Sequence, residues 1–113
     1  MIKEYTLEIK KSKFIAIRYE VHNTNEVEEI LKNLKKEHKK ARHIPYAYRI
    51  DNQIKKSDDK EPANTAGTPI YNLIINNDLN NILVVVIRYF GGTKLGAGLL
   101  TRSYLNAAKE VIK

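Results

Sequence analysis

The sequence contains no cysteine and no tryptophan, and its 113 residues include only five glycines, three prolines and two phenylalanines. Without cysteine the chain can form neither a disulfide framework nor a thiolate metal site. Residues 1–14 carry scattered charges and lack the apolar stretch of a signal peptide. The longest uninterrupted apolar run, Ile82 to Ile87, is far too short to cross a bilayer. We therefore expect a cytoplasmic protein without a membrane partner.

The charge that is present is mostly basic, with 20 Lys and Arg against 13 Asp and Glu and a formal net charge of +7. Such a balance favours acidic partners, of which nucleic acid is the commonest. Much of the excess is concentrated in one stretch, at Lys32, Lys35, Lys36, Lys39, Lys40 and Arg42. Lysines also cover the solvated face of ordinary amphipathic helices, so the net charge alone leaves both interpretations open.

Hydrophobic periodicity predicts an α+β fold. The predicted strands are residues 5–9, 14–21, 46–50 and 82–87, the last of them apolar enough to be buried on both faces. The predicted helices run from an N-cap at Thr24 to about Lys40, from Thr68 to Asn76, and from Leu99 onward. Residues 51–65 lack any period and should form a long loop. The order β-β-α-β-α-β-α predicts a two-layer sandwich, a four-stranded sheet with three helices mainly on one side.

A glycine-rich loop, Gly91 to Gly98, joins the last strand to the last helix. Glycine lacks the Cβ that blocks left-handed dihedrals, so this backbone can fold tightly and expose several amides together. The helix that follows adds the unpaired amides and positive dipole of its first turn. We predict a phosphate or carboxylate site here, and the alternative is that the glycines serve packing only. The candidate ligand-binding residues are Arg88, Gly91, Gly92, Lys94, Gly96, Gly98 and Arg102.

Two familiar glycine motifs do not fit this loop. A Walker A motif requires Lys and then Ser or Thr after the second glycine, but Ala97 follows Gly96. A dinucleotide fingerprint requires a third glycine where Thr101 stands and a further strand with an acidic residue. The sequence therefore implies no cofactor. The three histidines have no metal-ligand spacing, so a zinc site is not expected either.

A second candidate site is the acidic segment Asp58, Asp59 and Glu61 in the predicted long loop. These carboxylates can bind a hard metal ion or perform acid–base chemistry, or they can be solvated turn residues. Glu61 can instead pair with Arg88 or Lys94 and hold the two loops together. His43 precedes the third strand and can meet this segment. We therefore add Glu61 and His43 to the ligand-binding residues and assign no catalytic residue.

Several stretches resemble the YigZ/IMPACT family in order and spacing along nearly the whole chain. They are Ala41-Arg-His43 with Tyr46-Ala-Tyr48, Ser57 to Pro62, Thr65 to Ile70, and Val84 to Gly98, followed by Arg102 and Tyr104. The resemblance implies a two-layer fold like that of ribonuclease PH and domain IV of elongation factor G, several relatives of which bind RNA or phosphate. It also implies that residues 1–113 are one Impact N-terminal-type domain, a short form or fragment without the usual C-terminal ferredoxin-like domain.

The sequence departs from the family pattern at a few positions. Lys60 stands where the family usually has glycine, and Ala63-Asn64 replaces Ser-Gly, which predicts a stiffer acidic loop. Leu99 replaces a glycine after Gly98, which opposes close approach of a ligand there. Our first hypothesis is a translation-related module that binds RNA, the ribosome or another phosphate-bearing ligand. The alternatives are an enzyme acting on a small anionic substrate through the acidic loop, and a protein–protein adaptor in translational regulation.

Overall fold

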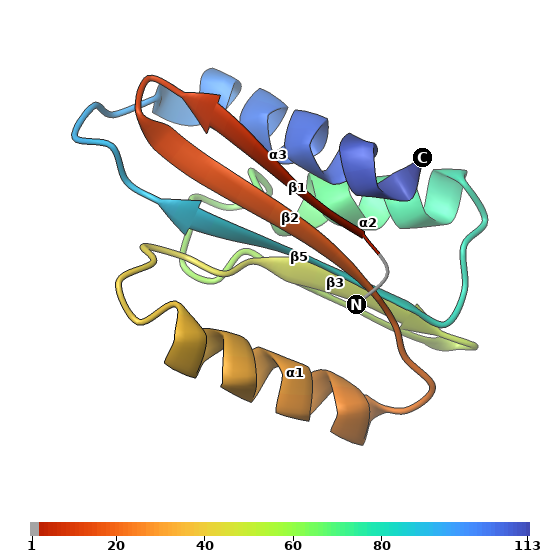
Figure 1. Cartoon of the computed structure of the whole chain (residues 1–113). Coiled ribbons are helices and arrows are strands. Elements are labelled where there is room, and N and C mark those ends of the chain that lie inside the picture. Colours follow the sequence, from red (N-terminus) through yellow and green to blue (C-terminus); the bar gives the residue numbers. More distant parts are fainter. Residues whose placement is uncertain (1–2) are drawn as a thin grey trace.

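The computed structural model describes residues 3–113, which form a five-stranded antiparallel sheet with three helices (Figure 1). The strands are β1 (Lys3–Ile9), β2 (Ser12–Glu20), β3 (Tyr46–Ile50), β4 (Gln53–Ser57) and β5 (Ile82–Tyr89). The helices are α1 (Thr24–Glu37), α2 (Gly67–Asn76) and α3 (Gly96–Ile112). The strand order is β1-β2-β5-β3-β4. None of the helices within residues 3–113 is long and apolar enough to cross a membrane.

The prediction of four strands was wrong because residues 53–57 form β4, an edge strand paired with β3. The connection is a tight turn at Asp51 and Asn52, with Asp51 in the left-handed region at φ 53°. β4 has only one apolar residue, Ile54, and most of its side chains are exposed. An edge strand tolerates such lysine-rich composition, which also discourages pairing with another chain. The predicted loop of residues 51–65 is therefore a hairpin followed by a shorter acidic loop, residues 58–66.

The helices cover both faces of the sheet, so the predicted two-layer arrangement was also wrong. α2 and α3 lie on one face and α1 lies on the other (Figure 1). The reason is β5, whose successive side chains point to opposite faces and are buried on both. The side chains packed with α2 and α3 are Ile82, Val84 and Val86, and those in the core beneath α1 are Leu83, Val85 and Ile87.

The helix boundaries differ from prediction in ways that matter for the site. The N-cap of α1 is Asn23, whose side-chain oxygen accepts from the Glu26 amide at 2.9 Å, and the helix ends at Glu37. α2 begins at Gly67, just before the expected Thr68, and ends at Asn76 as predicted. α3 begins at Gly96, so the last part of the predicted glycine loop is the first turn of a helix.

Candidate functional site

A pocket of about 460 Å³ lies where the acidic loop meets the N-terminus of α3. Its walls come from the turn before β3, the acidic loop, the end of β5 and the segment that leads into α3. The charged residues that line it are Arg42, Lys60, Glu61, Arg88 and Lys94. Four cations therefore surround a pocket to which, within residues 3–113, one carboxylate contributes.

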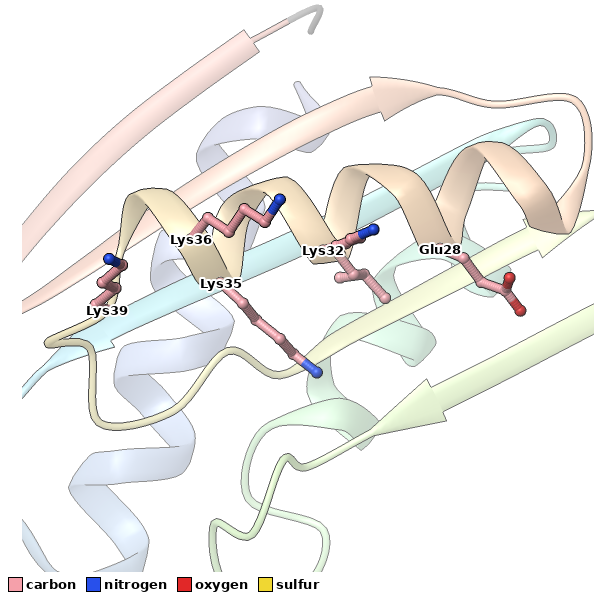
Figure 2. A pocket seen from close by; sticks show the side chains of 6 residues that line it. Glu28, Lys32, Lys35, Lys36 and Lys39 are labelled. Carbon is pink, nitrogen blue, oxygen red and sulfur yellow. The ribbon is translucent and has the colours of Figure 1, made fainter.

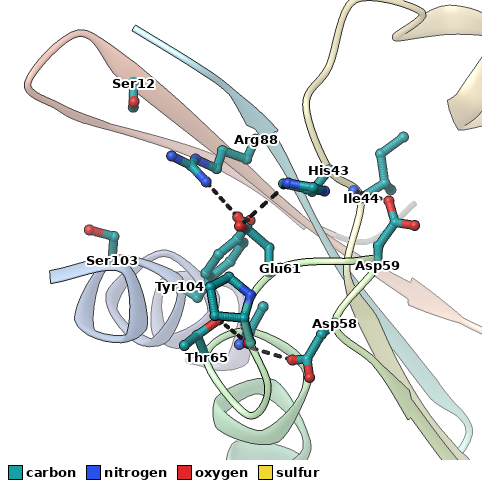
Figure 3. A network of polar contacts seen from close by, with 12 residues as sticks. Ser12, His43, Ile44, Asp58, Asp59, Glu61, Thr65, Arg88, Ser103 and Tyr104 are labelled. Carbon is teal, nitrogen blue, oxygen red and sulfur yellow. Dashed lines mark hydrogen bonds and ion pairs between the residues drawn. The ribbon is translucent and has the colours of Figure 1, made fainter. Parts of the chain in front are cut away.

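That carboxylate belongs to Glu61, whose side chain is only 3% exposed. Its Oε2 accepts hydrogen bonds from Arg88 Nη1 at 2.7 Å and from the Tyr104 hydroxyl at 2.5 Å, and its Oε1 lies 3.5 Å from His43 Nε2 (Figure 3). Burial, together with the Glu61 hydrogen bond, raises the pKa of Tyr104 far above its ordinary value, so the phenol stays protonated and donates. Such pairing is what keeps a buried carboxylate charged at acceptable cost.

Arg88, at the end of β5, is a buried cation fixed by both its backbone and its side chain. Its amide donates to the His43 carbonyl at 2.9 Å, and its carbonyl accepts from the Arg42 amide at 2.7 Å. Its guanidinium carbon lies 5.8 Å from the ring centroid of Phe14 and 5.9 Å from that of Phe90. The Nε atom is buried and has no hydrogen-bond partner within residues 3–113. Arg88 therefore offers the pocket region a hydrogen-bond donor that is unused within residues 3–113, while its charge is paired with Glu61.

The other two carboxylates of the acidic loop hold the backbone in place. Asp58 accepts from the amides of Asn64 at 2.9 Å, Ala66 at 3.1 Å and Gly67 at 2.7 Å. It thereby caps α2, whose N-cap residue Ala66 supplies no side-chain acceptor. Asp59 accepts from the Ile44 amide at 2.7 Å and ties the loop to the segment before β3. The structure thus assigns structural partners to these two carboxylates.

We expect Asp58→Asn to lower the free energy of unfolding by about 1 kcal/mol at pH 7. Burial raises the pKa of Asp58, but the backbone hydrogen bonds, then the charge of Lys56, outweigh burial and leave the folded-state pKa below its ordinary value. The stabilisation is therefore complete above the unfolded-state pKa of about 4 and is lost as the pH falls through the folded-state value. Urea denaturation at pH 7 and pH 3 measures the change in unfolding free energy. The control is Glu29→Gln, at an exposed position of α1. An equal loss of unfolding free energy at both pH values would contradict the assignment of the ionised Asp58 side chain as the cap of α2.

The four glycines of the predicted loop have different structural roles. A Cβ on Gly91 would lie 2.2 Å from the carbonyl carbon of Lys11, so this glycine allows close packing on the β1–β2 turn. Gly92 and Gly96 adopt left-handed φ angles of 93° and 77°, which favour glycine. Gly98 is an ordinary helical residue. Gly91 is therefore required for close packing, whereas Gly92 and Gly96 are favoured by their left-handed backbone angles.

Most of the backbone donors of this segment remain free. The Gly91 amide donates to Ser12 Oγ at 3.1 Å, but the amides of residues 92–98 have no acceptor within residues 3–113. The N-cap residue Leu95 makes no side-chain cap, and the first turn of α3 contains no acidic residue. Leu95, Gly96 and Ala97 line the pocket, so the positive end of the α3 dipole opens onto it. Anion binding there stays a prediction, and the donors it requires are available.

The structure brings some of the predicted ligand residues together and separates others. His43, Glu61, Arg88, Lys94 and Gly96 line the pocket. The predicted residues outside its lining are Gly91, Gly92, Gly98 and Arg102, and the last of these is exposed on α3.

The predicted ligand residues did not include Arg42, Lys60 and Phe90, which also line the pocket. The guanidinium carbon of Arg42 lies 4.4 Å from the ring centroid of Phe90, a cation–π contact beside the pocket. Phe90 is 37% exposed. One usable signal was the position of Phe90, which directly follows β5 and stands two residues after Arg88.

Residues 10–112 match the family of the Impact N-terminal domain. The chain belongs to this family. The relative YvyE of Bacillus subtilis, described as an IMPACT family member, is 40% identical over 110 residues, 95% of this chain and 51% of the relative. The IMPACT family member YigZ of Escherichia coli is 32% identical over 111 residues, 94% of this chain and 54% of the relative. The chain therefore spans about half the length of these bacterial members.

Solved structures agree with the family and with the fold. A crystal structure of a hypothetical protein superposes with a TM-score of 0.92 at 32% identity, over 96% of this chain and 55% of that chain. The structure of the two-domain translational regulator Yih1 superposes with a TM-score of 0.58 at 27% identity, over 97% of this chain and 45% of that chain. The family resemblance in the sequence is thus confirmed, whereas the likeness to ribonuclease PH and elongation factor G stays a prediction.

Proposed function

We propose that this Impact N-terminal domain binds RNA in a translation-related role, through phosphate groups held in the pocket between the acidic loop and α3. The charge of the pocket is the observation that supports the proposal. Arg42, Lys60 and Lys94 are exposed and have no acidic partner within residues 3–113. The carboxylate beside them, Glu61, is already engaged by protein donors. The similarity to Yih1, described as a translational regulator, supports the link to translation.

The chemistry of the pocket suits a phosphate with an adjoining base. Free amides at Gly96 and Ala97 and the ammonium of Lys94 are donors of the kind that bind phosphate at helix N-termini. The planar guanidinium of Arg42, held against Phe90, can pair with phosphate oxygens or stack on an unpaired base. Glu61 has a supporting role in this proposal, because it fixes Arg88 and does not itself face an anion.

The alternative of an enzyme acting through the acidic loop receives less support from the contacts. A general base must be free to accept a proton from its substrate. Asp58 and Asp59 instead accept from backbone amides, and Glu61 accepts from Arg88 and Tyr104. These contacts favour a binding role for the pocket.

The test is fluorescence anisotropy with a labelled single-stranded RNA of about ten nucleotides, measured across a series of salt concentrations. Each phosphate contact contributes about −0.7 to the slope of log affinity against log salt. We expect the pair Arg42→Ala and Lys94→Ala to weaken binding about tenfold or more and to make the slope shallower by about 1.4.

The matched control is the pair Lys3→Ala and Lys109→Ala, which removes the same net charge. Lys109 lies 13 residues after Gly96, about 20 Å along α3 from the pocket. Lys3 donates to the carbonyl of Lys113 at 3.4 Å, at that same distant end of α3. The control pair should retain binding, and an equal loss in both pairs would show that the attraction is diffuse and the pocket irrelevant. Affinity that stays flat from low to physiological salt would overturn the proposal outright.

A further inference from the structure

A second basic surface lies on α1, which covers the opposite face of the sheet from α2 and α3. Its cations, which we call the α1 lysine track, are Lys32, Lys35, Lys36 and Lys39. They border a groove of about 510 Å³ along the outer side of the helix (Figure 2). All four are exposed, and none takes part in an ion pair within residues 3–113. Four neighbouring cations are thus left without internal neutralisation.

The charge pattern along α1 gives this surface a direction. Three of its four acidic residues, Glu26, Glu28 and Glu29, occupy its first half, and the lysine track begins at Lys32. The fourth, Glu37, lies in the last turn and is paired with His38 at 3.6 Å. The helix dipole favours this polarity, but Lys39 lies beyond the last helical residue and outside that explanation. Like charges four residues apart, as in the pair Lys32 and Lys36, repel each other and oppose helix formation. A polyanion lying along the track would relieve this repulsion.

The track ends close to Arg42, a residue of the pocket of the proposed function. Lys39 is three residues from Arg42, so at most about 11 Å of extended chain separates their Cα atoms. Arg42 lines the pocket, and its backbone is bonded to Arg88. Lys32 and Lys36 lie about 6 Å apart along the helix axis, so the track continues in steps away from Arg42. The acidic first half of α1 marks the end at which a polyanion would be repelled.

We infer that a single-stranded RNA held in the pocket continues past Arg42 along the α1 lysine track, so that the domain binds a strand of several nucleotides. The inference rests on the proposed function and extends it. A regular row of cations matches the repeated phosphates of a strand. Five of the six residues that line the groove are charged, and four of these are lysines, whereas the centre of a protein–protein interface is depleted in charged residues. RNA therefore fits this surface better than a protein partner does.

The length of the ligand tests the inference. We would measure affinities of the 113-residue chain for a 5′-phosphorylated dinucleotide and for a single-stranded RNA of about ten nucleotides. The longer RNA should bind at least about tenfold more tightly, because it alone reaches the track. The variant with Lys32→Ala, Lys36→Ala and Lys39→Ala should lose this advantage, and its salt slope should become shallower by about 2. Its affinity for the dinucleotide should be unchanged.

The control variant combines Lys3→Ala, Lys109→Ala and Lys113→Ala, which removes the same charge at the distant end of α3. Circular dichroism confirms that each variant is folded, and alanine keeps the helical preference of α1. Equal affinity of the wild-type chain for both ligands would overturn the track while leaving the pocket in place. An equal loss in the control and track variants would overturn it as well. If neither RNA binds, the proposed function fails, and the track fails with it.

Discussion

Glu61→Ala is expected to lower the free energy of unfolding by about 3–5 kcal/mol, a large share of the stability of so small a domain. The Arg88 side chain is 9% exposed and would lose its only acidic partner within residues 3–113. The Tyr104 hydroxyl, on a fully buried residue, would lose its acceptor at the same time. Urea denaturation followed by circular dichroism measures the loss. A cost no larger than that of an exposed substitution would mean that the network does not stabilise the fold.

Two further variants separate the charge from the hydrogen bond. Tyr104→Phe removes one donor to Glu61 and keeps the edge-on ring contact with Phe14, whose centroid lies 5.0 Å away. It should cost about 1 kcal/mol. Combining Glu61→Ala with Arg88→Met removes both charges, and this double variant should be less destabilised than the sum of its single changes. Additive losses would show that the two charges do not stabilise each other.

Gly91→Ala is expected to destabilise the fold by about 3 kcal/mol, because the added methyl group would overlap backbone atoms of the neighbouring hairpin. The added Cβ would lie 2.2 Å from the Lys11 carbonyl carbon and 2.5 Å from the Ser12 nitrogen. Both are backbone atoms of the β1–β2 hairpin, so no side-chain rotation relieves the overlap. Either the hairpin or the start of the pocket segment must move. Thermal and urea denaturation of the variant measure the cost.

The neighbouring glycines provide the comparison that makes this result interpretable. Gly92→Ala meets no atom within 4 Å and should cost only about 1 kcal/mol, for the left-handed backbone angle. Gly98→Ala meets only the guanidinium of Arg102, at 3.6 Å. It should raise the stability by about 0.5–1 kcal/mol, because alanine favours the helix. If Gly91→Ala lowers the free energy of unfolding no more than Gly92→Ala does, the close packing of Gly91 on the hairpin does not contribute to stability.

The elements predicted correctly from the sequence are those whose local pattern matches their tertiary surroundings. β5 was recognised because its apolar residues face a core on both sides, and the β1–β2 hairpin was recognised by its alternation. β4 was missed because, as an edge strand with lysines on its surface, it carries no apolar period. The start of α2 was misplaced because its capping carboxylate, Asp58, lies nine residues earlier in another element. Helix-start rules that use only the residues next to the helix cannot predict a cap from a residue so far away in the sequence.

The residues of the candidate site likewise divide into those that a local pattern predicts and those that only long-range contacts bring together. Arg88 and Lys94 were predicted because they flank glycines in one continuous stretch. Arg42 joins them only because the bridge between His43 and Arg88 brings together residues 45 positions apart. Nothing in the sequence near Arg42 specifies that pairing, which depends on the way the segment before β3 meets the end of β5. The long-range part of the pocket therefore needed the structure.

The hydrogen bonds of Arg88 determine how binding in the pocket would change the stability of the domain. Its backbone holds the turn before β3, and its side chain holds the acidic loop. One wall of the pocket is thus tied to the sheet by backbone hydrogen bonds and another by the ion pair between Arg88 and Glu61. Binding in the pocket would accordingly stabilise the folded domain as a whole, because an occupant at free concentration L with no affinity for the unfolded chain raises the free energy of unfolding by RT ln(1 + L/Kd).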